Sequence, residues 1–132
     1  MTDSIYREII LEHSKNPNNY GTLDPNDATY EDTNPLCGDE VRIDVRMDGH
    51  RISEVAFSGQ GCAISQASAS ILMELVEGKT LEEIKAMSKE DLLDEVGITL
   101  SPARLKCALL SFSVLKSALF GPDYAAAELD DI

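Results

Sequence analysis

Three cysteines and one aspartate are the residues of this chain whose types and positions point most directly to chemistry. Cys37 and Asp39 flank a glycine, Cys62 follows a Gly-Gln-Gly segment, and Cys107 stands near the start of a predicted helix. Three thiolates and one carboxylate make a four-ligand set, which is what tetrahedral zinc or the irons of an iron-sulfur cluster require. A carboxylate is a poorer donor to these metals than a thiolate, so we expect a site that can release its metal.

The alternative for each cysteine is burial as a small apolar side chain, which is a common fate of free cysteine. The surroundings favour a metal or sulfur site instead. Asn34 and Pro35 form turns readily, and Gly38, Gly59 and Gly61 let the backbone approach an ion closely. Segments of this kind are unusual places for core packing.

The other nucleophilic and metal-binding side chains carry weaker signals. His13 follows two isoleucines in the first predicted helix, and His50 lies at a predicted hairpin turn, so neither has the spacing of a ligand. Ser65 and Ser68 have no base that the sequence identifies, and no histidine is placed to activate a cysteine. Serine-hydrolase chemistry has no support, and cysteine-hydrolase chemistry has little.

The composition limits the class of protein. A chain of 132 residues that is 43% hydrophobic predicts one domain, residues 1–132, with its own core. The low, odd number of cysteines and the absence of a signal pattern predict a cytoplasmic protein. Lys106 and Lys116 interrupt the longest apolar stretch, which argues against a membrane span. With 24 acidic and 11 basic side chains, the net charge of -13 should repel nucleic acid and anionic membranes.

Alternating residues predict a β-hairpin in the first half of the chain. Apolar and charged residues alternate over 41–47, and Asp48-Gly49 predicts a type I′ turn into a returning strand. We expect Ile52 to lie opposite Val45, with a bulge near residues 53 and 54 that keeps the later apolar side chains on the same face. The loops that precede and follow this hairpin should therefore meet at one edge of the sheet.

Cys62 is placed by this hairpin at the start of a predicted helix. Unpaired N–H groups and the helix dipole favour a thiolate at that position. A first helix is expected to be capped by Ser4 and to end near Lys15. Later helices should begin at residues that precede an acidic capping partner or a proline, namely Thr80, Ser88 and Ser101.

Cys107 is expected to lie away from the main apolar stripe of the last long helix. It is two positions after Leu105, which corresponds to about 200° around the helix axis. Arg104 and Lys106 beside it are cations that would stabilise an ionised thiol, although ordinary solvated surface residues would look the same. We therefore predict a thiolate outside the core, near two positive charges.

Three segments of the chain resemble the motifs of the U-type iron-sulfur cluster assembly proteins, the family that includes IscU and SufU. The segments are residues 34–39, 59–65 and 102–108, and the likeness extends over nearly the whole chain. The resemblance implies an α+β fold, in which a small three-stranded antiparallel sheet is covered by several helices and residues 28–33 form the third strand. It also implies a role in iron-sulfur cluster assembly, with sulfur supplied by a cysteine desulfurase.

The resemblance further implies which residues act. Cys37, Asp39, Cys62 and Cys107 would bind zinc at rest, or iron and a transient [2Fe-2S] cluster. From the residues themselves we expect Cys37 to be the sulfur acceptor, because its loop between Pro35 and Gly38 should be the most mobile of the three, with Cys107 and its cationic neighbours as the rival. The product would pass to apo iron-sulfur proteins or to a downstream scaffold.

Two features bear on the branch of the family. Lys106 stands where IscU proteins have a histidine, and residues 100–104 differ from the chaperone motif of IscU, so the third segment is closer to SufU. The chain nevertheless lacks the insertion that SufU proteins usually carry between Cys62 and Cys107. The sequence therefore allows two functions within the family, a cluster scaffold and a sulfur relay. A third hypothesis, outside this chemistry, is an interaction module that zinc stabilises and that handles no sulfur.

Overall fold

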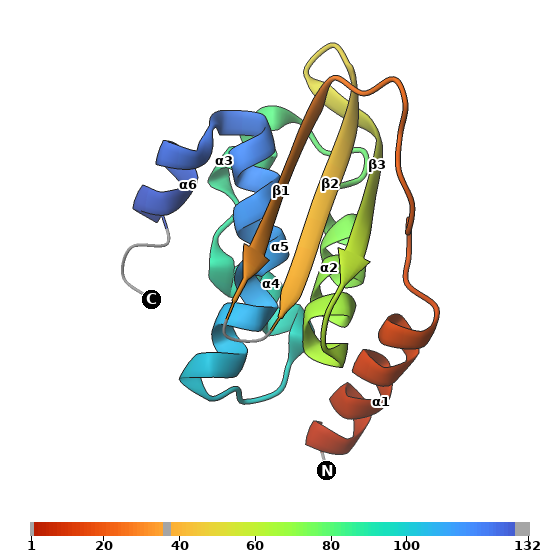
Figure 1. Ribbon diagram of the computed structural model, residues 1–132, viewed down its shortest axis with the longest axis vertical. Helices are drawn as coiled ribbons and strands as arrows, with labels where there is room; N and C mark the ends of the chain where they lie inside the picture. Colours follow the sequence, from red (N-terminus) through yellow and green to blue (C-terminus); the bar gives the residue numbers. More distant parts are fainter. Residues whose placement is uncertain (1, 36–37, 129–132) are drawn as a thin grey trace.

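The computed structural model describes residues 2–35 and 38–128 and folds them into a three-stranded antiparallel sheet with helices on one face (Figure 1). The strands β1 (Ala28–Asn34), β2 (Asp39–Asp48) and β3 (Arg51–Gln60) lie side by side in chain order. This architecture confirms the predicted α+β fold. The helices are α1 (Thr2–Lys15), α2 (Ala63–Val76), α3 (Leu81–Ala86), α4 (Lys89–Val96), α5 (Pro102–Phe120) and α6 (Pro122–Glu128).

The hairpin between β2 and β3 turns one residue later than the sequence predicted. Asp48 pairs with Arg51, so the loop contains only Gly49 and His50, and φ is positive (63°) at Gly49 but not at His50. A type I′ turn needs positive φ at both loop residues, so the prediction of type I′ is wrong. Glycine is required at the first loop residue only.

The register of the hairpin follows from the position of this loop. Val45 pairs with Val55 and Met47 with Ile52, so the predicted pairing of Ile52 with Val45 is wrong by two residues. The predicted bulge is present, because the register shifts between Arg46 and Met47 and leaves Ser53 as the extra residue. The bulge keeps the apolar residues of both strands facing the helices.

The main core lies between the sheet and helices α2 and α5. Residues of β2 with odd numbers, from Val41 to Val45, point into it together with Phe57 of β3, and all of these side chains are buried. Helix α5 is buried along most of its length because it contacts the sheet, α2, α4 and α6. A helix enclosed in this way buries more than one apolar face.

The helix boundaries follow local capping chemistry in most places. Thr80 and Ser88 form capping boxes, and Ser101 caps α5 ahead of Pro102, as predicted. Helix α1 ends at Lys15 as expected, but it begins at Thr2, so Ser4 lies within the helix and is not its cap. Helix α6 was not predicted from the sequence.

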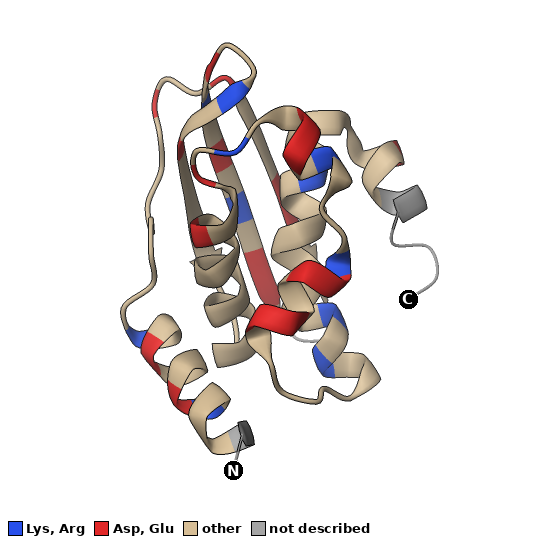
Figure 2. Ribbon diagram, turned by 180° about the vertical axis from the view of Figure 1, so that it is seen from behind, with Lys and Arg blue, Asp and Glu red and all other residues tan. Residues whose placement is uncertain are grey.

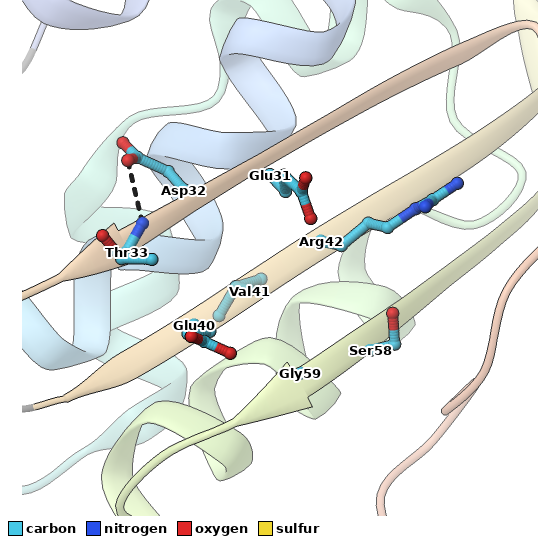
Figure 3. A pocket seen from close by; sticks show the side chains of 8 residues that line it. All are labelled: Glu31, Asp32, Thr33, Glu40, Val41, Arg42, Ser58 and Gly59. Carbon is cyan, nitrogen blue, oxygen red and sulfur yellow. Dashed lines mark hydrogen bonds between the residues drawn. The ribbon is translucent and has the colours of Figure 1, made fainter.

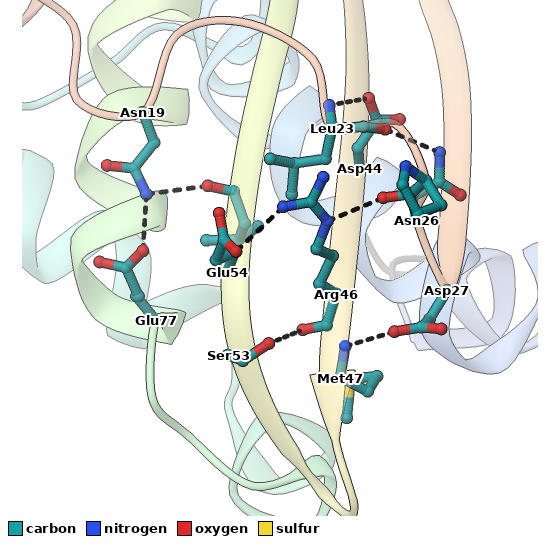
Figure 4. Close-up of polar contacts among 12 residues, drawn as sticks. Asn19, Leu23, Asn26, Asp27, Asp44, Arg46, Met47, Ser53, Glu54 and Glu77 are labelled. Carbon is teal, nitrogen blue, oxygen red and sulfur yellow. Dashed lines mark hydrogen bonds and ion pairs between the residues drawn. The ribbon is translucent and has the colours of Figure 1, made fainter.

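The segment between α1 and β1 is fastened to the free edge of β3. Gly21 N donates to Phe57 O at 2.7 Å, and Phe57 N donates to Asn19 O at 3.0 Å. Figure 4 shows the polar contacts of this segment, including the side chain of Asn19, which donates to the carbonyl of Val55. These bonds cover an edge that would otherwise be open to pairing.

Charged residues are distributed over the helical layer. In the ribbon of Figure 2, acidic residues are marked on α1, α3 and α4, with fewer basic residues among them. Within the described residues, no helix combines the length and the apolar character that crossing a bilayer requires.

Lys116 of α5 is fully buried and acts as a cap for α3. Its Nζ donates to the carbonyls of Lys85 and Met87 at 3.2 and 3.0 Å and lies 5.2 Å from the ring centre of Phe112. Lys116→Met would keep most of the volume but remove the donor from both carbonyls. We expect a loss of about 2 kcal/mol in the free energy of unfolding, measured by urea denaturation followed by circular dichroism. The exposed Lys106 provides the control Lys106→Met, and equal effects of the two changes would contradict the proposed cap.

Candidate metal centre

Asp39 stands at the start of β2 and is completely buried. Its Oδ1 accepts a hydrogen bond from the backbone N–H of Cys62 at 2.9 Å. Its Oδ2 is also buried but has no hydrogen-bond partner among the described residues. Such a carboxylate oxygen is costly unless something else binds it, and a metal ion is a natural occupant.

Gly61 makes this placement of Asp39 possible. A Cβ at Gly61 would lie 2.3 Å from Asp39 Oδ1 and 2.9 Å from Asp39 Cγ. The carboxylate of Asp39 therefore packs directly against the backbone of Gly61, and any residue with a Cβ at this position would clash with it. This explains in physical terms why the Gly-Gln-Gly segment precedes Cys62.

Cys62 is the N-cap residue of α2, as the sequence predicted. It is a free thiol with intermediate exposure. Because α2 and β3 meet here, the sulfur stands at the helix N-terminus, beside the carboxylate that accepts from its own N–H. The predicted meeting of the Asp39 and Cys62 segments at one edge of the sheet is confirmed.

Cys107 lies in the second turn of α5 and is only 1% exposed. The prediction that it stays away from the core is wrong. A single apolar stripe would leave Cys107 outside, but α5 packs against the sheet as well as against other helices, so this second face is also buried. Arg104 and Lys106, which were predicted to lie near its sulfur, are both exposed, and their stabilisation of an ionised thiol stays a prediction.

Asp39, Cys62 and Cys107 together form a group that can hold a metal ion. One ligand atom from each lies within 4.8 Å of the other two. Zinc–sulfur bonds of about 2.3 Å in a tetrahedron place sulfur atoms about 3.8 Å apart, so small movements would close the group around an ion. The soft sulfurs, the hard oxygen and the unpartnered Asp39 Oδ2 all fit zinc or iron.

Cys37, the fourth predicted ligand and the predicted sulfur acceptor, lies outside the described residues. Its place in a four-ligand set stays a prediction. Cys107 is in the disulfide-bonded state, whereas Cys62 is free. Thiolate ligands require reduced sulfur, so metal binding by Cys107 requires reduction first.

The structure adds one neighbour of the site that sequence reasoning did not identify as functional. Asn34, at the end of β1, pairs with Asp39 across the sheet and directs its Nδ2 to Cys107 Sγ at 3.9 Å. The predicted third strand stopped at Thr33, one residue short. Extending the antiparallel pairing by one step would have placed Asn34 opposite Asp39.

A separate hollow of about 440 Å³ lies on the face of the sheet that points away from the helices (Figure 3). Its walls include Glu31, Glu40 and Arg42, and no cysteine is among its described lining residues. Arg42 is occupied there by an ion pair with Asp44. The thiol chemistry therefore belongs to the Asp39, Cys62 and Cys107 group and not to this hollow.

Comparisons with known proteins agree with the geometry. The sequence model of the NifU-like N-terminal domain family matches residues 5–128. The zinc-dependent sulfurtransferase SufU of Bacillus subtilis is 37% identical, with 89% of this chain and 90% of that protein covered. The scaffold protein IscU of Streptococcus pyogenes is 33% identical, with 87% and 82% covered. The crystal structure of a proposed SUF-system scaffold from Fervidobacterium islandicum has a TM-score of 0.74 at 32% identity, with 90% and 99% covered.

Proposed function

Because this chain belongs to the family of NifU-like N-terminal domains, we propose that it works in iron-sulfur cluster assembly through a centre made of Cys37, Asp39, Cys62 and Cys107. The observation that carries the proposal is the close grouping of the last three of these residues, with ligand atoms within 4.8 Å. The relatives support two versions of the function, since one is named a zinc-dependent sulfurtransferase and another an assembly scaffold.

The four residues would hold zinc in the resting protein. Bound zinc would keep the thiols ionised at neutral pH. Asp39 offers the metal its free Oδ2 while the N–H of Cys62 holds the other oxygen in place. Since a carboxylate binds soft metals less tightly than a thiolate, Asp39 is the ligand that makes release easiest.

The sulfur step that we propose is thiol-persulfide exchange with a cysteine desulfurase. The acceptor thiolate attacks the terminal sulfur of the desulfurase persulfide and forms a new S–S bond. The original S–S bond breaks, and the desulfurase cysteine leaves as a thiolate. We propose Cys37 as the acceptor, and the burial of Cys107, which is 1% exposed, argues against this rival because the attack needs open approach to the sulfur.

In the scaffold version the same residues hold a [2Fe-2S] cluster as cargo. The cluster would pass to apo iron-sulfur proteins or to a downstream scaffold, and we propose that this occurs in the cytoplasm. Both versions need the same group of ligands, so the loaded species must be examined to distinguish them.

The test compares zinc-loaded and zinc-free protein after reduction and anaerobic incubation with ferrous iron and sulfide. Visible charge-transfer bands that grow as zinc is lost would support the scaffold version. A colourless protein that keeps one zinc per chain would support sulfur relay. We expect Cys62→Ala to lose most of the zinc and Ser68→Ala, on the same helix, to keep it. Unchanged metal content in Cys62→Ala would contradict the proposed centre.

Chelation distinguishes this function from a purely structural zinc module. A structural site contributes folding energy outright, so removing its metal should unfold the protein. The hydrophobic cluster between the sheet and the helices is built from apolar residues other than the four proposed ligands. We therefore expect the zinc-free protein to keep its circular dichroism spectrum, and unfolding on chelation would favour the structural alternative.

A further inference from the structure

Asn34 lies at the point where β1 ends beside the metal centre. It is 9% exposed and faces the helices, as Asp39 does on the paired strand. Its carbonyl accepts from the N–H of Gly38 at 2.9 Å, which fixes the backbone of Asn34 next to the loop that leads to Asp39. The position of its amide is therefore set by the sheet and by this turn.

The amide of Asn34 is directed at a ligand sulfur. The distance from its Nδ2 to Cys107 Sγ is 3.9 Å, within the range for a hydrogen bond to sulfur. Cys107 is disulfide-bonded in this structure, and reduction would turn the same sulfur into the thiolate that a metal needs. Cys107 approaches from α5, a distant part of the chain, so this contact exists only because α5 packs against β1. The side-chain amide of asparagine has N–H groups that can donate a hydrogen bond to a thiolate. An ionised carboxylate in the same place has no donor.

The hydrogen bond from Asn34 can compensate part of the negative charge of the metal centre. Three thiolates and one carboxylate carry four negative charges, and a divalent metal leaves about two of them uncompensated. Asp39 and Cys107 are almost fully enclosed, where uncompensated charge is costly. Hydrogen bonds to ligand atoms lower that cost and orient the ligands. Arg104 and Lys106 are exposed, so they are less suited than Asn34 to provide this compensation at Cys107.

We propose that Asn34 is a positioning residue of the metal centre, whose amide donates to the Cys107 thiolate, holds this sulfur at the end of the sheet and withdraws charge from it. The inference rests on the proposed function, because it needs Cys107 to be a metal ligand. It goes further by assigning the control of one metal–sulfur bond to a side chain that binds no metal itself.

The test uses the reduced full chain and the probes Zn²⁺ and Co²⁺. Asn34→Leu keeps a similar volume without a donor, and we expect zinc affinity to fall about 10- to 100-fold in competition with a chromophoric chelator. The sulfur-to-cobalt charge-transfer band should move to longer wavelength, because a thiolate without its hydrogen bond gives up electron density more readily. A purely structural role would leave the position of this band unchanged.

Asn34→Asp provides a second variant with almost the same shape. It replaces the donor by a negative charge, so we expect a larger loss of affinity than in Asn34→Leu. The control is Thr33→Ala, on the opposite, exposed face of β1, which should match the wild type. If wild type binds metal and both Asn34 variants match it in affinity and band position, the inference is wrong. If wild type itself binds neither ion, the proposed function fails instead.

Discussion

Gly61→Ala is expected to weaken zinc binding by about 100-fold while leaving the fold nearly unchanged. The added Cβ would lie 2.3 Å from Asp39 Oδ1, and Asp39 is 0% exposed, so the carboxylate has no free space into which it can retreat. The Asp39 carboxylate must therefore move away from the position in which its Oδ2 could bind a metal. Zinc affinity by chelator competition and circular dichroism of the zinc-free protein would measure the two effects separately.

Gly78→Ala is the matched control for this glycine. Its φ of 83° makes alanine unfavourable, but a Cβ there would meet nothing within 4 Å. We expect Gly78→Ala to cost about 1 kcal/mol of stability and to keep full zinc affinity, which is the reverse of the pattern for Gly61→Ala. The double variant Gly61→Ala with Asp39→Ala should bind zinc no more weakly than Asp39→Ala alone. Undiminished affinity in Gly61→Ala would contradict the role of Asp39 as a ligand.

Asp44→Ala is expected to lower the free energy of unfolding by about 3 kcal/mol. Asp44 is 1% exposed and accepts hydrogen bonds from Thr29 Oγ1 at 2.6 Å, Leu23 N at 3.0 Å and Arg42 Nε at 3.0 Å (Figure 4 shows the bond from Leu23). These donors come from β1, from β2 and from the segment that precedes β1. Removing the carboxylate would leave them without their acceptor and loosen that segment from the sheet.

Urea denaturation followed by circular dichroism would measure this loss. The exposed Asp48 in the same strand provides the control Asp48→Ala, for which we expect a change within about 0.5 kcal/mol. Similar losses in the two variants would mean that the effect comes from removing any acidic residue of β2 and not from the network around Asp44.

The same carboxylate makes stability depend on pH. Burial raises the pKa of Asp44, but hydrogen bonds from Thr29, Leu23 and Arg42, with the charge of Arg42, outweigh it and lower the pKa below its ordinary value. A lowered folded-state pKa means that the stabilisation is complete above the unfolded pKa of about 4 and is lost as pH falls below it. The stability difference between wild type and Asp44→Asn should therefore shrink below about pH 4. A difference that stays constant down to pH 2 would contradict this linkage.

Local patterns in the sequence were sufficient to predict the hairpin and most helix boundaries, and the family resemblance implied the fold class. Capping boxes and the Ser101-Pro102 start depend on residues no more than three positions apart, so local sequence is enough to predict them. The bulge at Ser53 was also predictable, because the apolar residues of the returning strand change phase at that point. The register was not, because the two-residue loop forms at Gly49 and His50 and not at Asp48 and Gly49.

The kinds of ligand atom, namely three thiols and a carboxylate, and the position of Cys62 at a helix N-terminus could be read from the amino-acid sequence. How these atoms meet depends on the packing of distant elements. The burial of Cys107 depends on α5 lying against both the sheet and other helices, and the close approach of Asp39 depends on the missing side chain of Gly61. The amide of Asn34 reaches Cys107 across 73 positions of sequence. Contacts between residues so far apart in the sequence arise when one element packs against another. The periodicity of residues within a single helix or strand cannot predict them.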